Sequence, residues 1–256
     1  PYTTLFRSSA LVVNTLKISL RIERPWVRDP SFTIVEKARA SATGYSFPSG
    51  HTQNAVSLFG TLAYAAKKLW IRILFIAVIG LVMLSRMYLG VHTPADVITA
   101  FAVTAVIAVV INLAADRLEL NKKRRLIIAL VIIGLGVIYT VFSIILLSAG
   151  KLSYANAADG FKGIGGGFAF AICWYVESTY VDFDTKCEHI WQQILKVVIG
   201  AGGVMLIRSG IKAAFDSGIV IDMLRYFLMV CWAMLVMPLI IKRFFAGVKK
   251  ADGEPA

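Results

Sequence analysis

Charged residues are scarce in this sequence. They make up 16% of its 256 residues, whereas a soluble domain carries about a quarter. Hydrophobic residues reach 58% and are gathered in segments separated by short polar breaks. These segments approach the roughly 20 residues that a helix needs to cross a hydrocarbon core of about 30 Å. A single soluble domain is therefore the weaker interpretation, and we predict an all-α protein, a polytopic transmembrane helical bundle.

Acidic residues and cysteines are also few. The chain has 15 Asp and Glu against 27 Lys and Arg, which gives a net charge of +12. In a soluble protein this excess would suggest nucleic acid. Here the charges lie mostly in loops between apolar segments, where they report orientation and contact with anionic membrane lipids, so we expect no nucleic-acid partner. Cys173, Cys187 and Cys231 stand far apart, and their spacing indicates neither a disulfide nor a metal site.

The order of apolar and polar segments predicts how the bundle is built. The chain begins at Pro1, and its first apolar run, 9–16, is too short to cross a membrane, so we expect a helix truncated at its beginning. No signal peptide is visible. Residues 17–47 are polar and basic and predict a long loop with a short helix near 34–40. About seven full spans follow, predicted at 51–66, 71–88, 94–114, 126–148, 163–181, 190–213 and 219–241.

The distribution of basic residues predicts the orientation. If the 17–47 loop lies on side A, counting the spans places the basic clusters of 67–72, 117–125 and 242–250 on side B. Basic loops favour the cytoplasm, so we expect a multi-pass protein of the cell membrane with a cytoplasmic C-terminus and an extracytoplasmic side A. The first loop is basic on the wrong side, and an anionic substrate would explain that.

Three clusters of polar residues fall on side A. The first is Lys17, followed after six residues by Arg24-Pro25. The second is Pro48-Ser49-Gly50-His51, at the start of a predicted helix. The third is Ser85-Arg86, followed after five residues by His92 and after three more by Asp96. Lys17, Arg24 and Arg86 supply three cations, and the planar fork of arginine fits phosphate oxygens in pairs. Ser49 and Gly50 stand where a helix begins, and its free N–H groups favour an anion. The set suits a tetrahedral anion whose charge spreads in the transition state.

Two histidines complete this set. His51 and His92 offer one nucleophile and one proton donor. Asp96 with one histidine gives too few ligands for zinc or magnesium, so we expect a reaction without metal or cofactor.

Asp96 itself has two interpretations. At the third position of a helix that starts after Thr93, it can close a capping box. Four residues after His92, it can instead bind one ring nitrogen of the imidazole and leave the other free to attack phosphorus. Arg86 nearby favours the second interpretation.

The three clusters resemble the signature motifs of the type 2 phosphatidic acid phosphatase (PAP2) superfamily, with every fixed position met in the same order. The resemblance extends over residues 16–114. It implies that His92 is the nucleophile that forms a phosphohistidine, that Asp96 orients it, and that His51 is the general acid. It also implies phosphate-binding roles for Lys17, Arg24, Ser49, Gly50 and Arg86, and a mechanism without metal.

The resemblance also predicts a division of the chain. Membrane members of the family resemble a six-helix bundle whose site opens near the outer leaflet, with two complete helices and most of a third ahead of the first motif. We therefore expect an N-terminally truncated phosphatase core at residues 1–115. Residues 116–256 are expected to form additional transmembrane helices of unknown role.

The C-terminal half holds glycine clusters and ionisable residues within apolar segments. The glycines suggest close helix contacts, as small residues allow in lipid. The ionisable residues either lie near interfaces or pair with one another, as Asp222 can with Arg225, or this half binds a lipid or partner or helps to form the substrate entrance.

The leading hypothesis from the sequence is hydrolysis of a lipid phosphate or diphosphate. Polyprenyl diphosphate, phosphatidylglycerol phosphate and phosphatidate are the candidates, and membrane lipids are the only other partners expected. The alternatives are a phosphotransferase with a lipid or sugar acceptor, and a non-catalytic membrane scaffold or transporter. A vanadium haloperoxidase would share the pocket, but those enzymes are soluble.

Overall fold

The computed structural model describes residues 2–40, 42–117, 120–181 and 190–244, and all regular structure within them is helical. The predicted all-α fold class is therefore confirmed. In chain order the helices are α1 (Tyr2–Leu20), α2 (Pro25–Arg28), α3 (Glu36–Arg39), α4 (Gly50–Ala55), η1 (Val56–Gly60), α5 (Thr61–Ala65), α6 (Leu69–Tyr88), α7 (Pro94–Arg117), α8 (Lys122–Ser148), α9 (Tyr154–Val176), η2 (Glu177–Val181), α10 (Ile190–Ala214), α11 (Ile219–Cys231), η3 (Trp232–Val236) and α12 (Met237–Phe244).

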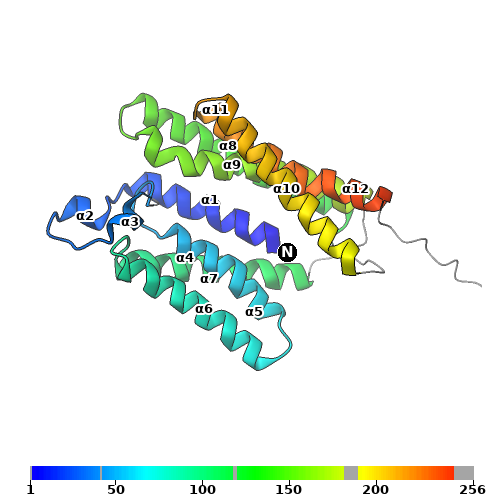
Figure 1. Ribbon diagram of the computed structural model, residues 1–256, viewed down its shortest axis with the longest axis horizontal. Coiled ribbons are helices and arrows are strands. Elements are labelled where there is room, and N and C mark those ends of the chain that lie inside the picture. Colours follow the sequence, from blue (N-terminus) through cyan, green and yellow to red (C-terminus); the bar gives the residue numbers. More distant parts are fainter. Residues whose placement is uncertain (1, 41, 118–119, 182–189, 245–256) are drawn as a thin grey trace, which may run out of the picture.

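Helix α1 lies between two groups of helices (Figure 1). On one side it packs against α4 and α7, and on the other against α8 and α9. Within the C-terminal group, α9 has its most extensive contacts with α11 and α8. The first half of the chain and the second half therefore meet along α1.

Five helical segments among the described residues are long and apolar enough to cross a membrane. They are Leu69–Tyr88, Pro94–Ala114, Lys122–Ser148, Ile190–Ala214 and Ile219–Arg243. Many of their large apolar side chains are exposed, including Leu81, Val106 and Leu206, as expected for surfaces that face lipid rather than a protein core. The protein has multiple membrane spans, but the predicted number of about seven is not confirmed.

The two other predicted spans are helical but differ from the five in composition and surroundings. The segment predicted at 51–66 is divided into α4, the π-helical turn η1 and α5, and it buries the polar residues Thr52, Gln53, Ser57 and Thr61. The segment predicted at 163–181 falls in α9 and the π-helical turn η2, and α9 begins earlier, includes Asp159 and Lys162, and buries Phe161 and Phe170. Neither segment is among the helices that are long and apolar enough to cross a membrane.

The C-terminal half shows the predicted close contacts and one predicted ion pair. At Gly165 of α9, an added Cβ would overlap the backbone of Met223 in α11, so only glycine allows these helices to approach so closely. Asp222 and Arg225 pair at 2.5 Å, and the Tyr154 hydroxyl donates to the same carboxylate at 2.6 Å. The pairing interpretation of these two charges is therefore confirmed.

Two of the cysteines lie close together in space. Cys173 and Cys231 are far apart in sequence, but the contact of α9 with α11 brings their sulfur atoms to 3.5 Å as free thiols. Cys187 lies outside the described residues.

The long first loop folds over the turn between α6 and α7. The loop contains α2 and α3, and α3 lies within the short helix predicted near 34–40. The Val35 amide donates to the Leu89 carbonyl at 3.2 Å. Gly90 has a φ of 71°, and a side chain there would overlap the Thr33 carbonyl. Figure 1 shows α2, α3 and the α6–α7 turn at one end of the bundle and the start of α1 at the other.

Candidate active site

The three sequence clusters meet at this end of the bundle. Lys17 lies in the last turn of α1, and Arg24 directly precedes α2. The second cluster caps and opens α4, and the third runs from the last turn of α6 to the first turn of α7. A cavity of about 280 Å³ lies between them and is lined by five predicted site residues, Lys17, Arg24, Gly50, His51 and His92.

His92 and Asp96 form a buried pair beneath this cavity. Their side chains are 1% and 4% exposed, and His92 Nδ1 lies 3.3 Å from Asp96 Oδ2. Arg24 Nη1 lies 3.0 Å from His92 Nε2. A guanidinium can only donate, so Nε2 accepts this bond and Nδ1 carries the proton that points to Asp96. Nε2, which lies against Arg24, is therefore the unprotonated ring nitrogen.

Asp96 makes both contacts that the sequence suggested, the helix cap and the contact with the His92 ring. The Thr93 amide donates to Asp96 Oδ2 at 2.8 Å, and the Asp96 amide lies 3.4 Å from the Thr93 hydroxyl, which is the geometry of a capping box. The same Oδ2 accepts from His92. The helix cap therefore holds the carboxylate at the position from which it orients the imidazole.

Burial sets the protonation state of His92. Loss of solvent lowers the pKa of His92 to about 4, although the hydrogen bond to Asp96 opposes this shift, and the charges of Arg24 and Lys17 add to it. The imidazole is neutral at pH 7 as a result. A neutral imidazole with its lone pair on Nε2 is the form that can act as a nucleophile.

Arg24 connects the first loop to the catalytic turn. Its Nε donates to Gly44 O at 3.0 Å, its Nη2 to Thr43 O at 2.6 Å, and its Nη1 to Val91 O at 2.9 Å. Because the side chain is only 7% exposed, these acceptors compensate the loss of water around the charge. The guanidinium is thereby held against His92.

The pKa values of Lys17 and His51 are both lowered in the cavity. Burial lowers the pKa of Lys17 to about 7, with a further contribution from Arg24, while its Nζ donates to Tyr45 O at 2.6 Å. Partial desolvation in the cavity and the charge of Arg86 lower the pKa of His51. A phosphate entering the cavity would raise both values, because an opposite charge favours the protonated form.

Ser49, Arg86 and Asp96 do not line the cavity. Ser49 is fully buried; its hydroxyl accepts from the Thr52 amide at 3.4 Å as the N-cap of α4, and its own amide donates to Asp96 O at 3.0 Å. Arg86 donates through Nη2 to Ser85 Oγ at 3.0 Å, and its Nε is buried without a partner among the described residues. Arg86 influences the cavity through its charge on His51.

Several residues of the site were not predicted from the sequence. Ser46, buried in the first loop, donates to Asp96 Oδ2 at 2.6 Å and lies 3.4 Å from His92 Nδ1. From α9, Asp159 and Lys162 line the cavity and pair at 3.0 Å, and Asp159 also accepts from Thr43 at 2.7 Å. For Asp159 and Lys162, the sequence offered one indication of a contact, their i,i+3 spacing near the start of a helix on side A. For Ser46, nothing in the sequence indicated a place in the site.

Comparison with known protein families covers both halves of the chain. The family model of the PAP2 superfamily matches residues 2–120. A second, described as PAP2 superfamily phosphatase, transmembrane extension, matches residues 161–250. The chain belongs to the PAP2 superfamily. It is a membrane phosphatase of that superfamily with a transmembrane extension, and the superfamily implies phosphate substrates. No curated protein and no solved structure gave a significant match.

The two matched regions meet at the cavity of this PAP2 phosphatase. All eight predicted site residues fall within the first region, whereas Lys162, Gly163 and Tyr226, which also line the cavity, fall within the extension. The extension is therefore part of the wall of the site. Among the described residues there is no group of three or more His, Cys, Asp or Glu side chains arranged to hold a metal ion.

Proposed function

We propose that this PAP2 phosphatase hydrolyses a lipid phosphate or diphosphate through a phosphohistidine formed on His92, without a metal. The observation that carries the proposal is the orientation of His92. Its Nδ1 faces Asp96, while Nε2 faces a cavity lined by Lys17 and Arg24. A nucleophile, its orienting carboxylate and cations for the phosphate oxygens are therefore present in one buried arrangement.

In the first step, His92 Nε2 attacks phosphorus as the bond from phosphorus to the leaving oxygen breaks. His51, protonated while the phosphate is bound, donates its proton to that oxygen. In the second step, a water oxygen attacks the phosphohistidine, the P–N bond breaks, and His51 takes the proton from the water. Inorganic phosphate and the lipid alcohol, or the lipid monophosphate from a diphosphate, are the products.

The cations stabilise the charge that develops on the phosphate oxygens. Arg24 lies against Nε2 and is therefore placed where the phosphoryl group is transferred. Lys17 and the backbone of Gly50 face the same cavity, and Arg86 contributes at longer range through its charge. Preorganised donors of this kind supply a large part of the rate enhancement in phosphoryl transfer.

Residues 1–115 form the phosphatase core in this proposal, and residues 116–256 form the extension that closes one side of the site. The end of the bundle that holds the site faces outwards, because the opposite end carries Lys67, Lys68 and the basic residues around the start of α8. A substrate anchored in the outer leaflet by its hydrocarbon part would present its phosphate to this end. Polyprenyl diphosphate, phosphatidylglycerol phosphate and phosphatidate all meet that requirement.

The direct test is phosphate release by the purified protein in detergent micelles containing EDTA. We expect free inorganic phosphate from at least one of these three lipids, with no acceptor added. Release that depends on an added sugar or lipid acceptor would indicate a phosphotransferase instead. Activity that EDTA abolishes would contradict the metal-independent mechanism.

The role of His51 can be tested by the choice of leaving group. His51→Gln should lower kcat for an alkyl phosphate about 10²–10⁴-fold, because the alkoxide leaving group needs a proton. With p-nitrophenyl phosphate, whose leaving group does not, the variant should release one rapid equivalent of nitrophenolate and then turn over slowly. Lys151→Gln, an exposed basic residue at the same end, is the matched control. Equal losses in the first step for both substrates would exclude His51 as the general acid.

A further inference from the structure

Arg24 is held by the backbone of a loop segment that belongs to no helix. Its Nη2 donates to Thr43 O at 2.6 Å and its Nε to Gly44 O at 3.0 Å. Residues 42–49 contain no regular secondary structure, so no helix fixes the positions of these two carbonyls. Their positions depend on what the segment packs against, and Arg24 in turn is the group that lies against His92 Nε2.

This loop segment lies against the start of α9, in the C-terminal half of the chain. The Thr43 hydroxyl donates to Asp159 Oδ2 at 2.7 Å. The next residue, Gly44, has a φ of 67°, and an added Cβ there would lie 3.5 Å from the Asn156 carbonyl. Both carbonyls that hold Arg24 therefore come from residues that lie against the first turns of α9.

The Asp159 carboxylate has a defined orientation. Its second oxygen, Oδ1, accepts from Lys162 Nζ at 3.0 Å. Although burial opposes the shift, the hydrogen bonds from Thr43 and Lys162 lower the pKa of Asp159, so the carboxylate is ionised at neutral pH. An ionised carboxylate bonded through both oxygens is a strong acceptor for the Thr43 hydroxyl.

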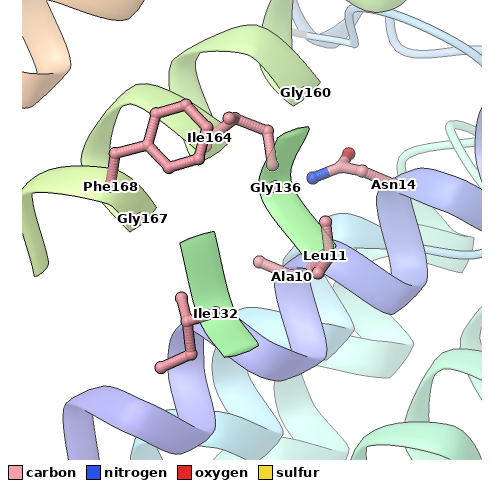
Figure 2. A pocket seen from close by; sticks show the side chains of 10 residues that line it. Ala10, Leu11, Asn14, Ile132, Gly136, Gly160, Ile164, Gly167 and Phe168 are labelled. Atoms are coloured by element: carbon pink, nitrogen blue, oxygen red, sulfur yellow. The ribbon is translucent and has the colours of Figure 1, made fainter. Parts of the chain in front are cut away.

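The backbone next to Asp159 is closely packed. Gly160 follows it in α9, and an added Cβ at Gly160 would overlap the Tyr139 ring of α8. Further along α9, the Phe168 ring lies where an added Cβ at Gly136 of α8 would be. Figure 2 shows Gly160, Phe168 and Gly136 around a cavity of only about 30 Å³. Helix α9 is therefore held firmly against α8 and can support the loop.

We propose that Asp159 is a positioning residue of the active site, which acts on Arg24 through Thr43. The Thr43 hydroxyl donates to Asp159, and the Thr43 carbonyl accepts from Arg24. Arg24 lies 3.0 Å from His92 Nε2, so a displaced loop segment would move the guanidinium away from the nucleophile. This inference rests on the proposed function, in which Arg24 stabilises the transferred phosphoryl group.

Asp159 also acts on Lys17 through its charge. Burial and Arg24 lower the pKa of Lys17 to about 7, while Asp96 and Asp159 raise it. The ionisable groups that line the cavity or act on Lys17 are Arg24, His51, His92, Asp96, Asp159, Lys162 and Tyr226. Loss of the Asp159 charge should therefore lower the pKa of Lys17 and reduce the fraction of protein with a cationic Lys17 at pH 7.

Thr43→Val tests the hydrogen bond, because it removes the hydroxyl and keeps the Asp159 carboxylate. It should lower kcat/KM for p-nitrophenyl phosphate about tenfold at every pH, since Arg24 loses its fixed position. Asp159→Ala breaks the same bond from the other side. On the acidic side of the pKa of Lys17, the losses from these two variants should not add in the double variant.

Asp159→Asn tests the charge, because the amide oxygen can still accept from Thr43. Activity that needs cationic Lys17 falls as the pH rises through its pKa, so a lower pKa moves this basic limb of kcat/KM to lower pH. Nitrophenolate leaves without a proton, so His51 does not contribute to the limb.

Glu36→Gln is the control for these variants. It removes a carboxylate from the exposed i,i+3 pair with Arg39 and should change neither kcat/KM nor the limb. Additive losses in the double variant would overturn the path through Thr43, and an unmoved limb in Asp159→Asn would overturn the effect of charge.

Nitrogen-15 spectroscopy of labelled histidine follows His92 without catalysis. The chain has three histidines, so the His92 signals can be assigned by their absence in His92→Asn. The Nε2 signal should shift in Thr43→Val and Asp159→Ala, which loosen Arg24, and should stay in place in Glu36→Gln. An unchanged signal in the first two variants would overturn the inference. If the wild-type protein releases phosphate neither from p-nitrophenyl phosphate nor from the three lipids while the signal responds in this way, the proposed function fails and the positioning of Arg24 stands.

Discussion

Replacing His92 with asparagine should lower phosphate release by about 10⁴-fold or more, because the attacking atom is removed rather than weakened. In the structure His92 Nε2 is the ring atom on the side of Arg24, and no other imidazole among the described residues lies against a carboxylate. Initial rates with a lipid phosphate in detergent measure the effect. Residual activity above about one hundredth of wild type would contradict the assignment, since loss of a covalent nucleophile costs far more.

Two further observations separate catalysis from folding in this variant. Arg24 retains its bonds to Gly44, Thr43 and Val91 when the imidazole is lost, so we expect thermal stability close to that of wild type. Brief incubation of wild-type protein with labelled substrate, followed by quenching in base, should trap label on His92, and the variant should trap none. Label on another residue would identify a different nucleophile.

Asp96→Asn should lower kcat about 10³–10⁴-fold while leaving the protein folded. The amide oxygen can still accept from the Thr93 amide, so the start of α7 keeps its cap. The loss comes from the imidazole, because a neutral amide does not stabilise the positive charge of the histidine that forms during transfer. Steady-state kinetics with one lipid phosphate measure the change.

The pH profile distinguishes this positioning role from a general disturbance of the site. Burial lowers the pKa of His92 to about 4, and without Asp96, which raises the pKa, the value would be lower. Activity requires neutral His92, so kcat/KM should fall as the pH drops through that pKa. Without the carboxylate the pKa is lower still, and the acidic limb should move to lower pH. A limb that stays in place or moves upwards would exclude this electrostatic role.

Ser46→Ala is the matched comparison for Asp96. It removes the 2.6 Å hydrogen bond to Asp96 Oδ2 and keeps the carboxylate. Loss of one hydrogen bond to a charged group corresponds to about 1.5–3 kcal/mol, so its effect on kcat should be well below that of Asp96→Asn. An equal or greater effect would show that Ser46, rather than the carboxylate, is the main support of His92.

The C-terminal half supplies part of the wall of the cavity, including Asp159 and Lys162 of α9. Thr43 of the first loop donates to Asp159 of α9 at 2.7 Å, and the Arg21 side chain reaches the Lys151 carbonyl in the α8–α9 turn. These bonds connect the first loop to the C-terminal half.

The sequence by itself determined the fold class and the superfamily, and it predicted the site residues. His92 and Asp96 are four residues apart at a helix start, so their contact follows from local geometry, and the order of apolar segments is enough to place all three clusters at one end. Only the tertiary structure showed that Ser46, Asp159 and Lys162 join them, since their positions depend on how a loop and a distant helix pack. It also decided where the helices are interrupted. The segment predicted at 51–66 is divided into α4, η1 and α5 and is therefore not one long span, since hydropathy reports how apolar a segment is and not where its helix breaks.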